Sequence, residues 1–242
     1  MSERVIEISD LSKNFDNKVV FKGFSMHLDK GENLAVLGRS GVGKSVLLKC
    51  ITGLMSPDSG SVSVLNKDIL KLKEDELNML RSRMGYLFQS GALYDSMTIY
   101  ENLLFPLQRN KYLKLNNPDR TIKEALNNVG LSDVMDMMPS ELSGGMKKRA
   151  GLARTLVMKP EIILYDEPTT GLDPFTAHEI SELIVSVGKK EGNSGVVVTH
   201  DMKCAKIVAD RIIVIDEGGI IAEGNYNELI KSKDQRIFQF FK

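Results

Sequence analysis

The segment at residues 38–45 reads Gly-Arg-Ser-Gly-Val-Gly-Lys-Ser and fits the pattern G-x-x-x-x-G-K-[ST], which is typical of loops that hold nucleotide phosphates. An apolar run at 33–37 precedes it and predicts a buried strand, and the apolar run at 46–51 predicts a helix. Glycines allow successive backbone N–H groups to point inward, and the helix N-terminus adds a partial positive charge. A glycine-rich turn that matched by chance would lack this strand and helix, so we expect a phosphate-binding loop in an α/β fold.

The loop residues have distinct expected roles. Lys44 can reach the β- and γ-phosphates, and the hydroxyl of Ser45 can hold Mg²⁺. The predicted nucleotide contacts in this segment come from Gly38, Arg39, Ser40, Gly41, Val42, Gly43, Lys44, Ser45 and Val46.

Further apolar runs indicate how the rest of the chain is organised. Continuous runs at 162–165, 195–198 and 212–215 are typical of strands buried on both faces, and they predict a mainly parallel sheet flanked by helices. A polar helix is expected from Glu74 to Arg83, followed by a short strand at 84–88. Between about residues 90 and 159 the pattern changes to helices and loops, with a helix-start signal at 116–119 and a helix expected from Lys147 to Val157. We therefore expect one domain over residues 1–242, with an α/β core at about 1–89 and 160–242 and an inserted α-helical subdomain at about 90–159.

Composition limits the possible functions. The 242 residues include 32 basic and 32 acidic side chains, a balance that argues against a broad nucleic-acid-binding face. Cys50 and Cys204 lie in apolar helical patterns. We therefore expect no disulfide framework, and we expect the protein to reside in a reducing compartment. No stretch approaches the roughly 18 apolar residues of a membrane span, and the first residues do not resemble a secretory signal.

Two adjacent carboxylates, Asp166 and Glu167, follow the apolar run at 162–165. Ligands of open α/β folds bind at the carboxyl ends of the strands, where these side chains would lie. Asp166 is suited to the shell of a Mg²⁺ ion. Glu167 is suited to polarising a water molecule for attack on the γ-phosphate.

A second candidate anion site lies at residues 142–145, Leu-Ser-Gly-Gly. Ser143 has the character of a helix N-cap, and the two glycines that follow leave backbone N–H groups uncovered. The simpler alternative is a capped helix with no ligand. The 142–145 segment lies after a phosphate loop and before an apolar strand that ends in Asp-Glu. This order of motifs resembles that of the ATP-binding-cassette (ABC) ATPases.

That resemblance covers nearly the whole chain and implies a RecA-like P-loop NTPase fold with an antiparallel β edge, using ATP and Mg²⁺. It implies that Gln89 contacts Mg²⁺ or the attacking water, that His200 contacts the γ-phosphate, and that Phe15 stacks on adenine. Glu167, His200, Lys44 and Gln89 would then be the catalytic residues. The predicted metal ligands are Ser45, Gln89 and Asp166, and the remaining nucleotide-binding residues are Ser143, Gly144, Gly145 and Asp173, the last in the D-loop at 171–173.

The same resemblance implies a homodimer in which two copies meet head to tail. Each 142–145 segment would close on the nucleotide held by the other copy, so the partner would supply Ser143 and Gly145. Two residues depart from the family pattern: Met146 stands where glutamine is usual, and Val46 stands where a second hydroxyl is common. Neither change removes a group that the chemistry needs.

Within the family, residues 89–102 and 138–149 resemble the ATPases of MCE-protein-associated, Mla-type phospholipid transporters, and Met146 agrees with this branch. The resemblance implies integral membrane permease subunits and an MCE-domain protein as partners, no nucleic acid, and a peripheral location at the cytoplasmic face of the inner membrane. The cargo would be phospholipid moving between the inner and outer membranes, in a direction that the sequence does not indicate.

Three alternatives stay open at this point. The first is an ATPase for another cargo (amino acids, metals, lipoproteins) or for a cell-division permease complex. The second is a soluble tandem-cassette protein, although such proteins normally carry two cassettes or a long coiled-coil insertion. The third is a small P-loop kinase or GTPase, which would lack the 142–145 segment and His200; the Asn-Lys-x-Asp motif that reads guanine is also missing.

Overall fold

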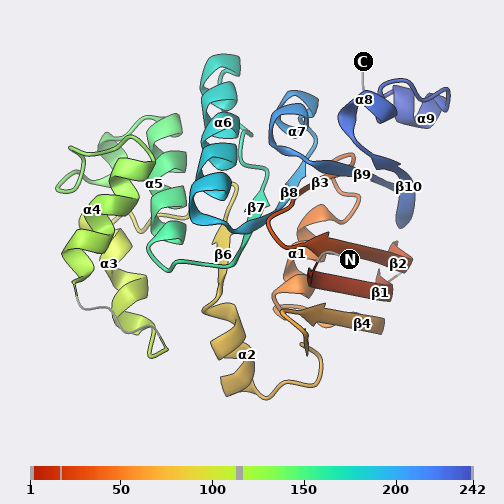
Figure 1. Ribbon diagram of the computed structural model, residues 1–242, viewed down its shortest axis with the longest axis horizontal. Coiled ribbons are helices and arrows are strands. Elements are labelled where there is room, and N and C mark those ends of the chain that lie inside the picture. The colour runs from red at the N-terminus through yellow and green to blue at the C-terminus, as the bar shows by residue number, and fades with distance from the viewer. Residues whose placement is uncertain (1–2, 17, 113–116, 241–242) are drawn as a thin grey trace.

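A six-stranded sheet forms the centre of the computed structural model, which describes residues 3–16, 18–112 and 117–240 (Figure 1). Its strand order is β10-β9-β3-β8-β7-β6. The pairs from β9 to β6 are parallel and the β10–β9 pair is antiparallel, so the predicted mainly parallel sheet is confirmed. The strands are β3 (Asn33–Leu37), β6 (Met84–Leu87), β7 (Ile162–Asp166), β8 (Ser194–Thr199), β9 (Arg211–Asp216) and β10 (Gly219–Gly224).

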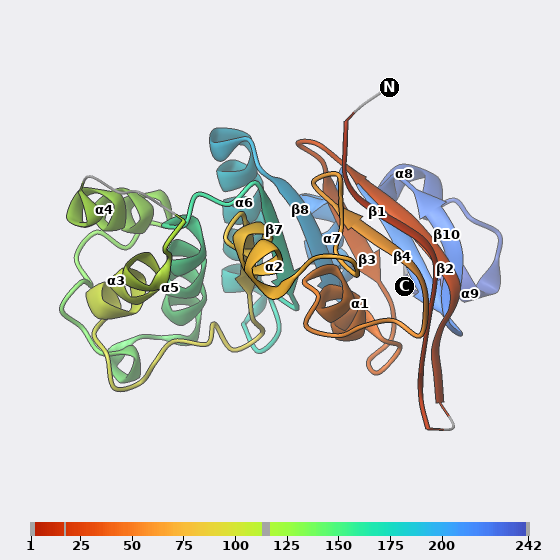
Figure 2. The same ribbon diagram turned by 90° about the horizontal axis from the view of Figure 1, so that it is seen from below.

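The predicted antiparallel edge is a second sheet of four strands, in the order β2-β1-β4-β5. All its pairs are antiparallel. Its strands are β1 (Arg4–Phe15), β2 (Lys18–Asp29), β4 (Ser59–Val64) and β5 (Lys67–Asp68). Figure 2 shows helix α1 (Lys44–Ile51) between this sheet and the central one.

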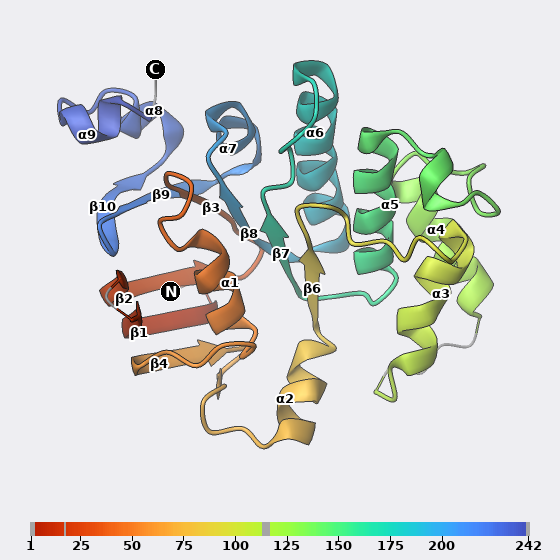
Figure 3. The ribbon, with the colours of Figure 1, turned by 180° about the vertical axis from the view of Figure 1, so that it is seen from behind.

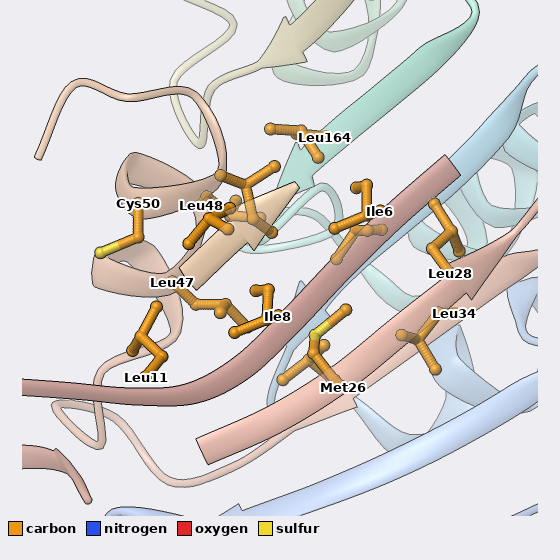
Figure 4. Close-up of a cluster of buried hydrophobic side chains, with 14 of the residues drawn as sticks. Ile6, Ile8, Leu11, Met26, Leu28, Leu34, Leu47, Leu48, Cys50 and Leu164 are labelled. Atoms are coloured by element: carbon orange, nitrogen blue, oxygen red, sulfur yellow. The ribbon is translucent and has the colours of Figure 1, made fainter. Parts of the chain in front are cut away.

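Helix α1 is apolar on more than one side because it fills the space between the two sheets. Leu47, Leu48 and Ile51 are fully buried and belong to one cluster with side chains of both sheets, Ile6 and Leu164 among them (Figure 4). This packing fixes the start of α1 beside the carboxyl ends of the central strands. The phosphate-loop candidate is positioned in this way.

Helices α6 (Pro174–Glu191) and α7 (Met202–Val208) lie on the other face of the central sheet (Figure 3). Helices α3 (Ile99–Arg109), α4 (Pro118–Asn128) and α5 (Gly144–Leu156) gather to one side of the sheet (Figure 1). Their apolar side chains share a cluster with Ile163 and Val197 of the sheet. The proposed subdomain boundaries near residues 89 and 159 remain a prediction. Four short helices complete the described part: α2 (Glu74–Arg81), the 3-10 helix η1 (Pro139–Glu141), α8 (Tyr226–Leu229) and α9 (Gln235–Phe238).

Several predicted element ends shift. The polar helix expected to reach Arg83 ends at Arg81, because the N–H groups of the next two residues turn back to carbonyls of its last turn. Strand β6 ends at Leu87 and leaves Phe88 outside, since its ladder with β7 stops at the Leu87–Tyr165 pair. The helix expected from Lys147 begins at Gly144, directly after its cap Ser143.

The helix start predicted at residues 116–119 is observed from Asn117, whose Oδ1 accepts a hydrogen bond from the N–H of Arg120 at 3.0 Å. Asn116, which belongs to the same prediction, lies outside the described residues. Over the described ranges, none of the helices combines the length and the apolar character needed to cross a membrane.

Candidate active site

The loop between β3 and α1 has the backbone geometry of a phosphate-binding loop. Gly43 is the N-cap of α1 with φ 115°, and a Cβ atom there would lie 2.4 Å from Cγ1 of Val20. Gly41 has φ 79°, also in the region that favours glycine. Both positions therefore require glycine, and the loop can curl so that its N–H groups face a bound anion.

Lys44 extends across this loop. Its Nζ donates hydrogen bonds to the carbonyl oxygens of Gly38 at 2.7 Å and Arg39 at 3.3 Å. The same Nζ lies 3.1 Å from Oε1 of Glu167, and the two side chains are 6% and 12% exposed. The ammonium is thus fixed at the mouth of the loop, where the outer phosphates of a nucleotide would lie.

Glu167 follows β7 and holds a left-handed backbone conformation, with φ 50°. Its N–H donates to the carbonyl of Val198 on β8, which fixes this strained residue at the sheet edge. Its Oε2 lies 2.8 Å from Nδ1 of His200. Burial acts to raise the pKa of Glu167, but the hydrogen bond with His200 and the charge of Lys44 outweigh it, so the pKa lies below its ordinary value. Glu167 is therefore a carboxylate at neutral pH, as a group that accepts a proton from water must be.

The carboxylate of Asp166 accepts hydrogen bonds from two hydroxyl groups. Its Oδ1 accepts a hydrogen bond from the hydroxyl of Ser45 at 3.1 Å, and its Oδ2 accepts one from the hydroxyl of Tyr86 at 3.0 Å. Hydroxyl, carboxylate and amide oxygens are ligand types that Mg²⁺ prefers, and Gln89 lines the same cavity as Ser45, so the metal site of Ser45, Gln89 and Asp166 remains a prediction. In the described part of the chain no group of three His, Cys, Asp or Glu side chains could hold a metal. The predicted ligands Ser45, Gln89 and Asp166 are not a group of that type. Few protein ligands are needed, because waters and substrate phosphates usually complete the coordination shell of Mg²⁺.

A cavity of about 490 Å³ brings most of the predicted site residues together. Phe15, the candidate adenine platform, lines it and is 41% exposed, and Nζ of Lys13 lies over its ring at 5.4 Å from the centroid. The predicted residues that line this cavity are Phe15, Ser40, Gly41, Gly43, Lys44, Ser45, Val46, Gln89, Glu167 and His200.

Other predicted residues do not line this cavity. Gly38 and Arg39 line a smaller neighbouring cleft, and Ser143, Gly144 and Gly145 lie at the start of α5. Ser143 accepts a hydrogen bond from the N–H of Met146 at 3.3 Å, so the predicted N-cap is confirmed. In this single chain none of residues 142–145 lines the cavity beside the phosphate loop, and a contact of this segment with nucleotide remains a prediction.

Asp173 also lies outside the cavity lining. It caps helix α6, accepting hydrogen bonds from the N–H groups of Phe175 and Thr176 at 3.0 and 3.1 Å. Its Oδ2 accepts another from the hydroxyl of Thr176 at 2.6 Å. Within this chain Asp173 therefore shapes the start of α6, and a contact with nucleotide remains a prediction.

Some residues of the site were not predicted from the sequence. Lys18 and Thr170 line the cavity, and Tyr86 contacts Asp166. Lys148 is buried in α5, and its Nζ donates hydrogen bonds to the carbonyls of Gln89 and Glu167. Burial lowers the pKa of Lys148, and the nearby carboxylates oppose this effect. Nothing in the local sequence distinguishes Tyr86 or Lys148 from an ordinary strand or surface-helix residue.

Comparison with known protein families gives a match to the ABC transporter family over residues 21–170. The ATP-binding protein MlaF of the intermembrane phospholipid transport system of Haemophilus influenzae is 37% identical over 242 residues, which cover 100% of this chain and 92% of that protein. The methionine import ATP-binding protein MetN of Rhizobium johnstonii is 39% identical over 223 residues, which cover 92% of this chain and 61% of that protein.

Solved structures agree on the fold. The structure of cbiO1 from Clostridium perfringens, part of the ABC transporter complex cbiONQ, has a TM-score of 0.87 at 32% identity and covers 96% of this chain and 92% of its own. The dimeric post-hydrolysis structure of the ATP-binding cassette MJ0796 bound to ADP and Pi has a TM-score of 0.81 at 29% identity and covers 91% of this chain and 98% of its own. The predicted P-loop NTPase fold is confirmed.

Proposed function

The chain belongs to the ABC transporter family of ATPases, and we propose that it powers phospholipid transport between the inner and outer membranes of a Gram-negative-type cell. The observation that carries this cargo is the match to MlaF, which extends over the entire chain. Residues 89–102 and Met146 resemble the same branch. Amino-acid transport is the second candidate, because MetN is similar at 39% identity.

In the proposed reaction, Glu167 orients a water molecule and accepts its proton as the oxygen attacks the γ-phosphate. Its lowered pKa keeps it deprotonated, and its contact with His200 fixes the direction of the carboxylate. Lys44 and His200 hold the γ-phosphate and stabilise the charge that develops on it.

The proposed ligands of Mg²⁺ are Ser45 and Gln89, with Asp166 supporting. When bound, the ion would neutralise charge on the β- and γ-phosphates. The side chain of Asp166 is oriented for this role by its hydrogen bonds with Ser45 and Tyr86.

We propose that two copies of the chain form the complete site. The 142–145 segment of one copy would close over the nucleotide bound to the loop of the other, adding Ser143 and Gly145 to the phosphate contacts. Such an interface is two-fold symmetric. The MJ0796 cassette, a relative in fold and sequence, forms a dimer, which supports this arrangement.

The surface that would face the membrane permease follows Gln89. Arg154 of α5 donates to the carbonyls of Ala92 at 2.5 Å and Gly91 at 3.3 Å, which holds this turn against the helical subdomain. Tyr94, which is 47% exposed, packs against the half-buried ring of Phe105 at a centroid distance of 5.2 Å and an interplanar angle of 60°. An exposed aromatic ring on a braced turn suits contact with a helix of a partner protein. The proposed location is the cytoplasmic face of the inner membrane, held there by the permease.

Affinity purification of the tagged protein from its native membranes, with mass spectrometry of the co-purifying proteins and lipids, tests this function. A permease recovered with an MCE-domain protein and phospholipid is the expected result. A permease recovered with a soluble amino-acid or metal receptor would retain the ATPase and overturn the cargo.

A further inference from the structure

Lys148 is a buried cation that the proposed reaction does not use. It lies on α5, close after the 142–145 segment, and only 5% of it is exposed. Burying an ammonium group is costly unless its donors are satisfied. Here the donors reach backbone carbonyls, those of Gln89 and, at 3.3 Å, Glu167.

These two carbonyls follow the ends of neighbouring strands. The ladder between β6 and β7 ends at the Leu87–Tyr165 pair, so its regular hydrogen bonds stop before Gln89 and Glu167 are reached. Beyond that point the ammonium of Lys148 joins the two segments that follow these strands. Gln89, which follows β6, and Glu167, which follows β7, therefore share a single hydrogen-bond donor.

The side chain of Lys148 also connects the turns after β6 and β7 to the 142–145 segment, which is proposed to contact the nucleotide bound to the other copy. Ser143 caps the helix that carries Lys148, so the 142–145 segment and the ammonium are joined through the first turns of α5. Gly151 of the same helix packs closely on the turn, since a Cβ there would lie 2.9 Å from the carbonyl oxygen of Gly91. Helix α5 and the turn after β6 thus form one tightly packed unit.

We propose that Lys148 is a positioning residue that sets the distance between Gln89 and Glu167 and couples both to helix α5. The inference rests on the roles proposed above for these two residues. Without the ammonium, the carbonyls of Gln89 and Glu167 lose their shared donor, and the turn after β6 separates from the turn after β7. We expect nucleotide binding to be retained, because Lys148 itself does not line the phosphate-binding cavity.

The test replaces Lys148 with methionine, which keeps the length of the side chain and removes the donors. We expect kcat to fall about 10- to 100-fold, the effect of misplacing a catalytic group by about 1 Å, while KM for ATP stays within about threefold. Lys148→Gln retains a neutral donor and should lose less activity than Lys148→Met. Lys123→Met, at an exposed position on α4, is the matched control and should keep the wild-type rate.

A spectroscopic readout separates positioning from general damage. The chain contains no tryptophan, so Phe88→Trp places a single reporter beside Gln89, and Phe238→Trp places one on α9 in a separate protein. In the Lys148→Met background, acrylamide quenching should change for the reporter at position 88 and stay the same at position 238.

Three outcomes would overturn the inference: a normal kcat in Lys148→Met, equal losses in Lys148→Gln and Lys148→Met, or changes at both reporters. Glu167→Gln is measured in parallel. If Glu167→Gln itself hydrolyses ATP normally, the proposed catalytic role fails; if it is inactive while Lys148→Met is active, only the role of Lys148 fails.

Discussion

The Nζ atom of Lys44 lies 3.1 Å from Oε1 of Glu167, and both side chains are nearly buried. One residue begins α1 and the other follows β7, so the contact joins the phosphate loop to the proposed base. Because Lys44 is proposed to hold the γ-phosphate, we expect ATP to compete with Glu167 for this ammonium. The contact thereby links the occupancy of the loop to the freedom of the carboxylate.

Replacing Glu167 with glutamine should abolish turnover and preserve ATP binding. An amide cannot accept the proton from water, so phosphate release should fall by about 100-fold or more. The proposed dimer should then persist with ATP, which light scattering measures. Glu182→Gln, on the exposed side of α6, is the control. A Glu167→Gln protein that stays monomeric at high concentration with ATP contradicts the head-to-tail scheme for the isolated subunit.

Removing the hydroxyl of Tyr86 should weaken the use of Mg²⁺. In Tyr86→Phe, Asp166 loses one of its two hydrogen bonds, worth about 1 kcal/mol. We expect the Mg²⁺ concentration for half-maximal ATPase activity to rise roughly fivefold, the factor that corresponds to this energy. Tyr112→Phe, which removes a hydroxyl bonded to the carbonyl of Asp75, should leave it unchanged. An unchanged Mg²⁺ requirement in Tyr86→Phe would rule out the orienting role.

The two glycines after Ser143 should differ in their tolerance of alanine. A Cβ at Gly145 would lie 2.5 Å from Cγ2 of Thr176, whereas a Cβ at Gly144 would have 3.6 Å to Cδ2 of Leu172. Gly145→Ala should therefore destabilise the fold by about 1–3 kcal/mol through overpacking. Gly144→Ala should change the free energy of unfolding by less than about 1 kcal/mol, because alanine favours a helix. Urea unfolding measures both, and equal losses would contradict the packing argument.

Arg211 should be important for stability. Its guanidinium bonds both carboxylate oxygens of Glu32, at 2.7 and 3.0 Å, and the carbonyl of His27 at 2.8 Å, so it connects β9 to the antiparallel sheet. Arg211→Met would leave the carboxylate of Glu32 without this partner, at a cost of about 3 kcal/mol. Arg120→Met removes an exposed ion pair with Glu124 and should have no measurable effect. Similar unfolding midpoints for the two variants would show that burial adds nothing to the Arg211 pair.

Both cysteine thiols should react slowly with a labelling reagent, and the rate should rise steeply with pH. Cys50 and Cys204 are free and buried, and burial raises the pKa of each thiol to about 11. Since only the thiolate reacts, labelling should be slow at pH 8 and rise about tenfold for each pH unit toward 10. Timed labelling with a thiol reagent checks this, and the unfolded chain is the control. A thiol that reacts at pH 8 as fast as it does in the unfolded chain would contradict its burial.

Much of this architecture could be predicted because it is encoded locally. Apolar runs predicted the central strands, since a strand buried on both faces needs no polar positions. The phosphate loop was evident because its glycines are required by backbone geometry, as the φ of 115° at Gly43 illustrates. Ser143 was predicted as an N-cap from residue type alone, and its hydrogen bond agrees.

The connections within the site depended on tertiary structure. Tyr86 reaches Asp166 because β6 and β7 are neighbours in one parallel register, and Lys148 reaches Gln89 and Glu167 because α5 packs beside the ends of those strands. Such contacts join residues far apart in the sequence, and their geometry follows from strand register and helix packing. The sequence by itself determined the phosphate loop, the paired carboxylates after β7 and the N-cap Ser143, because loops, caps and strands follow from local preference. Only the fold decided which of these groups touch, because burial forces each polar atom to find a partner among distant segments.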